Sequence, residues 1–222
     1  MTRKKSLIGT VIIACIIMGI VDAIIQPAYA VKSIIKIVLF LCLPICYALW
    51  DKEINLKALL RPKKEGLLVA IGLGIGIYVF IVGAYLLLRN VFDFSAVTST
   101  LEDTIGVDTG NFIWVALYIS FANSLLEEFF FRGFAFLSLK RVASRRFAYC
   151  FSALVFALYH IAMMIGWFGI EVILLVLLGL FVGGLIFNLF NEKTGNIYIS
   201  WLIHMCANFA INTVGFILFG IL

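Results

Sequence analysis

Two adjacent glutamates and an arginine interrupt an apolar run in the middle of the chain. In LLEEFFFRG, residues 125–133, the polar residues Glu127, Glu128 and Arg132 are otherwise surrounded by Leu and Phe. An ionised side chain at bilayer depth costs about 2.5–3.5 kcal/mol on insertion scales, so such groups face a protein interior or a watery cavity. Glu128 and Arg132, at i and i+4, can pair on one helix face. Arg132 cannot fully satisfy both carboxylates, which leaves Glu127 for chemistry.

Two further apolar stretches carry the only histidines, His160 and His204. Helical spacing defines three stripes, one on each of three apolar stretches, and the second and third contain the histidines. The stripes are Ser120, Asn123, Ser124, Glu127, Glu128 and Arg132; Phe156 and His160; and Ser200, His204, Asn208 and Asn212. At 1.5 Å per residue, Glu127 and both histidines lie between about 12 and 21 Å from the predicted cytosolic helix ends. Three helices can therefore bring them to one level. Asn212 is interpreted as a helix-packing residue.

These residue types suit the attack of water on an amide. That reaction needs a base for the water, donors for the oxyanion and an acid for the leaving amine. Glu127 is the candidate base, a neutral His160 can share the water, and His204 and Asn208 can aim donors at the oxyanion. This mechanism needs no cofactor. A divalent metal such as zinc stays open, and its ligands would be Glu127, His160 and His204. The HExxH, GxSG and GxGD motifs of other membrane proteases are absent from the sequence.

The composition defines an integral membrane protein. Of 222 residues, 64% are hydrophobic and 13% charged, against about 45–50% and about 25% in soluble domains. The net charge of +5 sits in short loops and at the N-terminus, as in the positive-inside pattern, so nucleic acid is excluded as a partner and the lipid bilayer is indicated.

Apolar windows predict an all-α, polytopic transmembrane bundle that forms a single membrane domain over residues 1–222. The seven predicted spans are 6–25, 33–50, 67–88, 111–139, 147–165, 170–190 and 197–220. The loops between spans two and three, four and five, and six and seven are basic, and Lys63 is among their residues, so the N-terminus is predicted to be cytosolic. An eighth, short or re-entrant element in 89–110 stays open. Ala28–Ala30 resembles a signal-peptide cleavage site, but the long first run with Asp22 favours a retained anchor.

Three motifs together resemble a known family. EEFFFR fits EExxxR, FALYH fits FxxxH and HMCAN fits HxxxN, in that order. They are similar to the CAAX protease and bacteriocin-processing (Abi) family, which includes the type II CAAX prenyl endopeptidases, and the resemblance covers residues 110–212 as a catalytic core. It implies a membrane endopeptidase in which Glu127 and His160 activate water, His204 and Asn208 form the oxyanion site, and Arg132 holds Glu128.

The resemblance also implies a substrate class and a location. Small bacterial relatives process bacteriocin or pheromone peptides or act in self-immunity, so we expect a leader-type or membrane-anchored peptide substrate, cut near the cytosolic face of a bacterial cytoplasmic membrane. Two other functions remain as alternatives: a non-catalytic bacteriocin immunity protein, and an ion-coupled transporter, against which the lack of paired halves argues.

Overall fold

The computed structural model describes residues 2–62 and 64–222, and within these ranges the regular structure is entirely helical. Lys63, one of the basic loop residues, lies outside them. Seven helical stretches in the described ranges are long and apolar enough to cross a membrane, which confirms the predicted all-α bundle. They are Arg3–Ile25, Tyr29–Trp50, Leu67–Leu88, Phe112–Ser138, Arg145–Met164, Ile170–Thr194 and Tyr198–Leu218. The second begins earlier than predicted and so contains Lys32 as well as Lys36. The cytosolic placement of the N-terminus stays a prediction from loop charge.

Several spans change their helical geometry along their length. The first consists of α1 (Arg3–Ile20) and the π-helical η1 (Val21–Ile25), and the second of α2 (Tyr29–Ile37), η2 (Val38–Cys42) and α3 (Leu43–Trp50). The fourth consists of α7 (Phe112–Tyr118), η3 (Ile119–Asn123), α8 (Ser124–Glu127) and η4 (Glu128–Ser138). The others are α5 (Leu67–Leu88), α9 with α10 (Arg145–Tyr159, Ile161–Met164), α11 (Ile170–Thr194) and α12 (Tyr198–Leu218).

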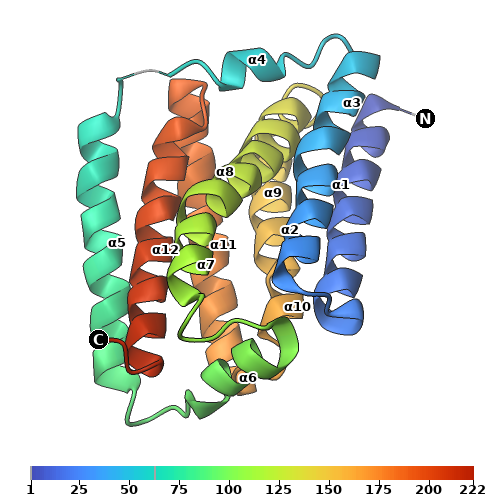
Figure 1. The fold of residues 1–222 in the computed structure, drawn as a ribbon. Coiled ribbons are helices and arrows are strands. Elements are labelled where there is room, and N and C mark those ends of the chain that lie inside the picture. Colours follow the sequence, from blue (N-terminus) through green and yellow to red (C-terminus); the bar gives the residue numbers. More distant parts are fainter. Residues whose placement is uncertain (1, 63) are drawn as a thin grey trace.

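Two short helices mark the ends of the bundle (Figure 1). Helix α4 (Leu56–Leu59) lies on the connection that crosses one end from the α1–α3 edge to α5, and helix α6 (Ser95–Ile105) lies at the opposite end. At 11 residues, α6 is too short to span a bilayer, which needs about 17–25 residues. The open eighth element is therefore this short helix. The backbone amide of Ile197 donates to the carbonyl of Leu59 at 3.2 Å, tying α4 to the start of α12.

The second half of the fourth span, η4, is central because its phenylalanines pack against neighbouring helices. Phe130, Phe131, Phe134 and Phe136 have no exposed surface. Phe130 stacks on Phe40 of η2 with ring centroids 4.3 Å apart, and the cluster continues into α1 and α9. Stacked and edge-to-face rings at such distances add to the energy of burying their surface. This segment, which begins at Glu128 directly after Glu127, is thereby held in the interior.

A close approach of two helices supports the same arrangement. Helices α9 and α11 come so near at Gly184 that an added Cβ would lie 3.0 Å from the Cα and Cβ of Ala153. Small residues at such crossings let membrane helices pack backbone to backbone. Helix α9 also packs on η4, where the Phe156 ring lies 5.3 Å from that of Phe131, so His160, directly after α9, lies beside the central span.

Candidate active site

The glutamates lie at a junction in the fourth span: Glu127 ends the single α-helical turn α8, and Glu128 begins the π-helical η4. In η3 the amide of Ser124 reaches back to the carbonyl of Ile119, five residues earlier. Single π turns within α-helices widen the helix and are frequent at functional sites. Here the Ile119 carbonyl also accepts a hydrogen bond from Asn208 of α12. The irregular turn therefore links the fourth span to the seventh beside the glutamates.

The two oxygens of Glu127 have different surroundings. Oε1 accepts hydrogen bonds from Lys36 Nζ at 2.9 Å and from Asn123 Nδ2 at 3.0 Å. Oε2 lies 3.8 Å from His160 Nε2 and 3.7 Å from His204 Nε2. The carboxylate is buried, with 1% of the residue exposed. One oxygen is thus fully engaged, and the other faces both histidines.

Hydrogen bonds to the far side of each imidazole determine which nitrogen faces Glu127 as an acceptor. His160 Nδ1 lies 2.7 Å from the carbonyl oxygen of Phe156. His204 Nδ1 lies 2.9 Å from Oε1 of Glu128. A carbonyl or carboxylate oxygen can only accept, so both Nδ1 atoms carry the proton and each neutral ring presents a lone pair at Nε2. The Nε2 lone pairs of His160 and His204 therefore lie close to Oε2 of Glu127.

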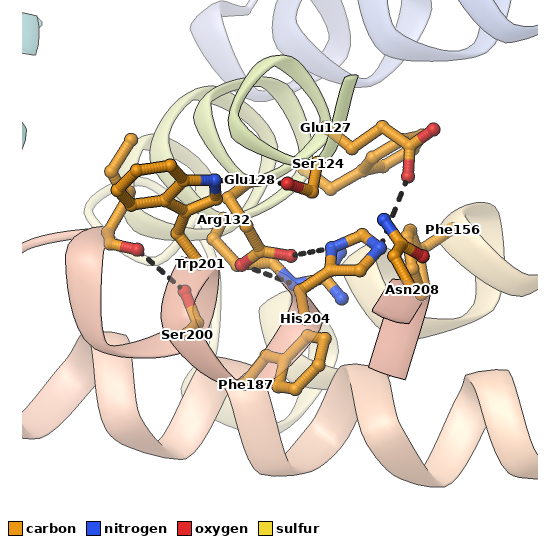
Figure 2. A network of polar contacts seen from close by, with 12 residues as sticks. Ser124, Glu127, Glu128, Arg132, Phe156, Phe187, Ser200, Trp201, His204 and Asn208 are labelled. Atoms are coloured by element: carbon orange, nitrogen blue, oxygen red, sulfur yellow. Dashed lines mark hydrogen bonds and ion pairs between the residues drawn. The ribbon is translucent and has the colours of Figure 1, made fainter. Parts of the chain in front are cut away.

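Glu128 and Arg132 lie one helical turn apart, behind His204 (Figure 2). Glu128 Oε2 is 3.5 Å from Arg132 Nε, and both side chains are fully buried. The guanidinium carbon lies 3.9 Å from the centre of the Phe156 ring and 5.0 Å from that of Phe187. A desolvated cation over aromatic faces is attracted to their π electrons. Glu128 thus has Arg132 on one side and His204 on the other.

Asn208 and Asn212 of α12 both donate to the fourth span. Asn208 Nδ2 lies 3.0 Å from the Ile119 carbonyl oxygen, and Asn208 follows His204 by four residues on α12 (Figure 2). One amide hydrogen is thus used in packing, and one remains for a ligand. Asn212 Nδ2 donates to the Ala116 carbonyl and to Ser120 Oγ, at 3.1 and 3.0 Å. Its contacts are those of a helix-packing residue.

The structure thus brings all six predicted residues into one buried region, with Glu127 and both histidines at the same level. Sequence reasoning missed Lys36 as a member of this region. A lysine inside an apolar span was the available signal, because such residues are functional candidates by default. Asn123 was counted in the polar stripe without a role. Both side chains complete the surroundings of Glu127.

A metal ion in this region would require several converging donor atoms. Neutral imidazoles held at Nδ1 and a carboxylate are suitable donor types. However, no group of three His, Cys, Asp or Glu side chains in the described ranges has the geometry of a metal cluster. The ammonium of Lys36 also lies 2.9 Å from Glu127, where it would repel a bound cation. The mechanism proposed below therefore uses no metal ion, and a divalent metal held by Glu127, His160 and His204 stays the alternative.

Fold and site together define a class: a polytopic helical membrane protein with a glutamate–histidine centre buried among its spans. The comparison with known families is consistent with this class. Residues 109–210 match the family described as type II CAAX prenyl endopeptidase Rce1-like. This segment is thus similar to the CAAX protease family, whose members are membrane peptidases. No curated protein and no solved structure gave a match. The first three spans lie outside the matched segment.

Proposed function

We propose that the protein is an intramembrane endopeptidase in which Glu127 and His160 activate the attacking water. The observation that carries this proposal is the convergence of Glu127 Oε2 with the Nε2 atoms of His160 and His204, at 3.8 and 3.7 Å. These gaps are too long for direct hydrogen bonds. A water between Glu127 Oε2 and His160 Nε2 would donate one hydrogen to each and point its lone pairs away, towards a substrate carbonyl.

In the proposed step, the water oxygen forms a bond to the carbonyl carbon while one O–H bond breaks. The proton moves to Glu127 Oε2, and the carbonyl oxygen gains the negative charge. The C–N bond then breaks as a proton delivered through His160 Nε2 reaches the leaving amine. Positioned acids and bases of this kind contribute about 10²–10⁴-fold to a rate.

His204 and Asn208 are the proposed oxyanion donors, with one change from the expectation based on sequence. The neutral ring of His204 presents a lone pair at Nε2, so it can donate there only as an imidazolium that has taken up a proton from bulk water before the attack. Glu128, at 2.9 Å from Nδ1, stabilises that protonated form. Asn208 contributes the amide hydrogen that the Ile119 carbonyl does not use. Donors aimed at developing charge in a dry site are worth more than in water.

The substrate class follows from where the site lies. A peptide must reach a buried centre among membrane spans, which suits a leader-type or membrane-anchored peptide. The family description names CAAX prenyl endopeptidases, so a lipidated C-terminal peptide is one candidate probe. We further propose a role in bacteriocin or pheromone maturation, or in self-immunity, in a bacterial cytoplasmic membrane with cleavage near the cytosolic face.

The test is cleavage by purified protein in detergent, without an ion gradient. The probes are a farnesylated CaaX peptide, the same peptide unmodified and an apolar leader-type peptide, with products identified by mass spectrometry. We expect at least one to be cut by the wild type and by Glu102→Gln, an exposed control on α6, and kcat to fall about 10²–10⁴-fold in Glu127→Gln. Undiminished cleavage by Glu127→Gln would contradict the proposed mechanism.

The same variant separates the alternative functions. A non-catalytic immunity protein would still protect cells when Glu127→Gln is inserted normally. A transporter would move an ion in sealed vesicles without cutting any probe. Protection lost at normal expression, together with lost cleavage, supports the peptidase.

A further inference from the structure

We propose that Lys36, on the second span, is a positioning residue that docks Oε1 of Glu127 and thereby aims Oε2 at the two histidines. This inference deepens the proposed function and, in its catalytic consequence, depends on it. It assigns a role in the site to a residue outside the segment that matches the peptidase family, residues 109–210.

Three side chains form a closed set of hydrogen bonds. Lys36 Nζ donates to Glu127 Oε1 at 2.9 Å and to Asn123 Oδ1 at 2.6 Å. Asn123 Nδ2 completes the set by donating to the same Oε1 at 3.0 Å. Lys36 and Glu127 are 4% and 1% exposed. Each partner thus fixes the other two in a region shielded from solvent.

The geometry has a direct consequence for Oε2. A carboxylate is planar, so two bonds to Oε1 restrict rotation of the whole group and hold Oε2 in one direction. Oε2 then lies at nearly equal distances from the Nε2 atoms of His160 and His204. Without the two donors, the carboxylate could turn either oxygen to the histidines, or turn away. Catalytic groups need to be held in place by such supporting bonds.

Besides orienting the Glu127 carboxylate, Lys36 places a positive charge next to it. A buried carboxylate without a partner is strongly disfavoured, and Arg132 lies with Glu128 instead. Lys36 therefore supplies the positive charge next to Glu127. Its ammonium is also flanked by aromatic rings, 5.1 Å from the centre of Tyr159 and 5.8 Å from that of Phe40. Aromatic faces stabilise a cation at such distances.

A second lysine on the same helix face provides a matched control. Lys32, one turn before Lys36, pairs with Asp22 of η1 at 2.5 Å. The two lysines thus serve different carboxylates. Replacing Lys32 and Asp22 together by Met and Asn removes a partly buried pair from the same two spans and leaves the contacts of Lys36 in place.

The first experiment measures kcat and KM with whichever of the three peptide probes the wild type cuts. Lys36→Met is expected to lower kcat about 10²-fold or more, the scale of a positioned acid or base, with little change in KM. Lys36→Arg keeps a buried cation and should recover part of kcat. Lys32→Met/Asp22→Asn should keep the wild-type kcat. Wild-type kcat in Lys36→Met, or no recovery in Lys36→Arg, would overturn the inference.

The second experiment needs no substrate. Thermal unfolding in detergent is compared for Lys36→Met, Glu127→Gln and the double variant. Each single change removes one partner of a buried pair, whereas the double change removes both, so the double variant should melt at a higher temperature than Lys36→Met. Strictly additive losses would show that the pair does not exist. If the wild type cuts no probe, the proposed function fails, yet this comparison still decides whether Lys36 holds Glu127.

Discussion

Nδ1 of His204 lies 2.9 Å from Oε1 of Glu128, and both side chains are buried. The adjacent glutamates therefore have separate partners: Glu127 meets Lys36 and Asn123, whereas Glu128 meets His204 and Arg132. A carboxylate behind an imidazole holds its tautomer and stabilises the protonated ring, as in other hydrolytic centres. The separate roles proposed for these two neighbouring residues rest on this difference in contacts.

Glu128→Gln tests the support that Glu128 gives to His204. Glutamine keeps an oxygen that can accept from Nδ1 but loses the negative charge that stabilises a protonated imidazole. We expect kcat to fall by about 10²-fold or more with little change in KM, measured by steady-state cleavage of the peptide that the wild type cuts. An unchanged kcat would show that the charge of Glu128 has no part in catalysis.

Arg132→Met tests whether the guanidinium stabilises the fold through Glu128. Removing one partner of a buried ion pair typically costs about 3–5 kcal/mol, because the other charge stays unpaired. We expect a clear fall in the thermal unfolding temperature in detergent. The double variant Glu128→Gln/Arg132→Met should be more stable than Arg132→Met alone. If Arg132→Met melts like the wild type, the pair contributes no stability.

Two neighbouring glycines on α11 test the close contact between α9 and α11. At Gly184 an added Cβ would lie 3.0 Å from Ala153, whereas at Gly183 nothing lies within 4 Å. Gly184→Ala should destabilise the protein, by about 1–3 kcal/mol as for other overpacked contacts. Gly183→Ala should be neutral or stabilising, because alanine is the better helix former. Chemical or thermal unfolding of both variants measures this, and equal effects would exclude a tight crossing at this point.

Metal removal tests the cofactor-free mechanism. We expect protein stripped with a chelator, with its metal content checked by elemental analysis, to keep its cleavage rate. Loss of activity on stripping, with recovery on adding zinc, would contradict the mechanism and would make Glu127, His160 and His204 the ligands to test. A mutant protein with Glu127→Gln serves as the inactive reference in both conditions.

Much of the fold could be predicted because it depends on local properties of the chain. Runs of apolar residues long enough to cross a bilayer identified all seven spans, since backbone polar groups in lipid must be satisfied within a helix. The four-residue spacing of His204 and Asn208 likewise predicted their shared face. The 11-residue helix α6, in contrast, stayed open because a short amphipathic segment has no comparable constraint on its length.

The roles of the phenylalanines beside the glutamates depended on contacts across the bundle. Hydropathy does not distinguish a side chain that faces lipid from one that packs on a neighbouring helix, since both surroundings are apolar. The structure buries Phe130 and Phe131 against Phe40 from a distant span. The π-helical geometry of η4 also changes which residues share a face, so a wheel drawn at 3.6 residues per turn describes this segment poorly.

By itself, the sequence determined that this is a helical membrane protein and which ionisable residues its spans carry. It also predicted that Glu127 and the two histidines lie at one depth, because depth depends only on position along each helix. Only the tertiary structure decided which groups meet. Lys36 pairs with Glu127 across 91 positions of the chain, and Glu128 with His204 across 76. Such partners are selected by how the helices rotate and pack against one another, and periodicity within a single helix carries no information about its neighbour's rotation.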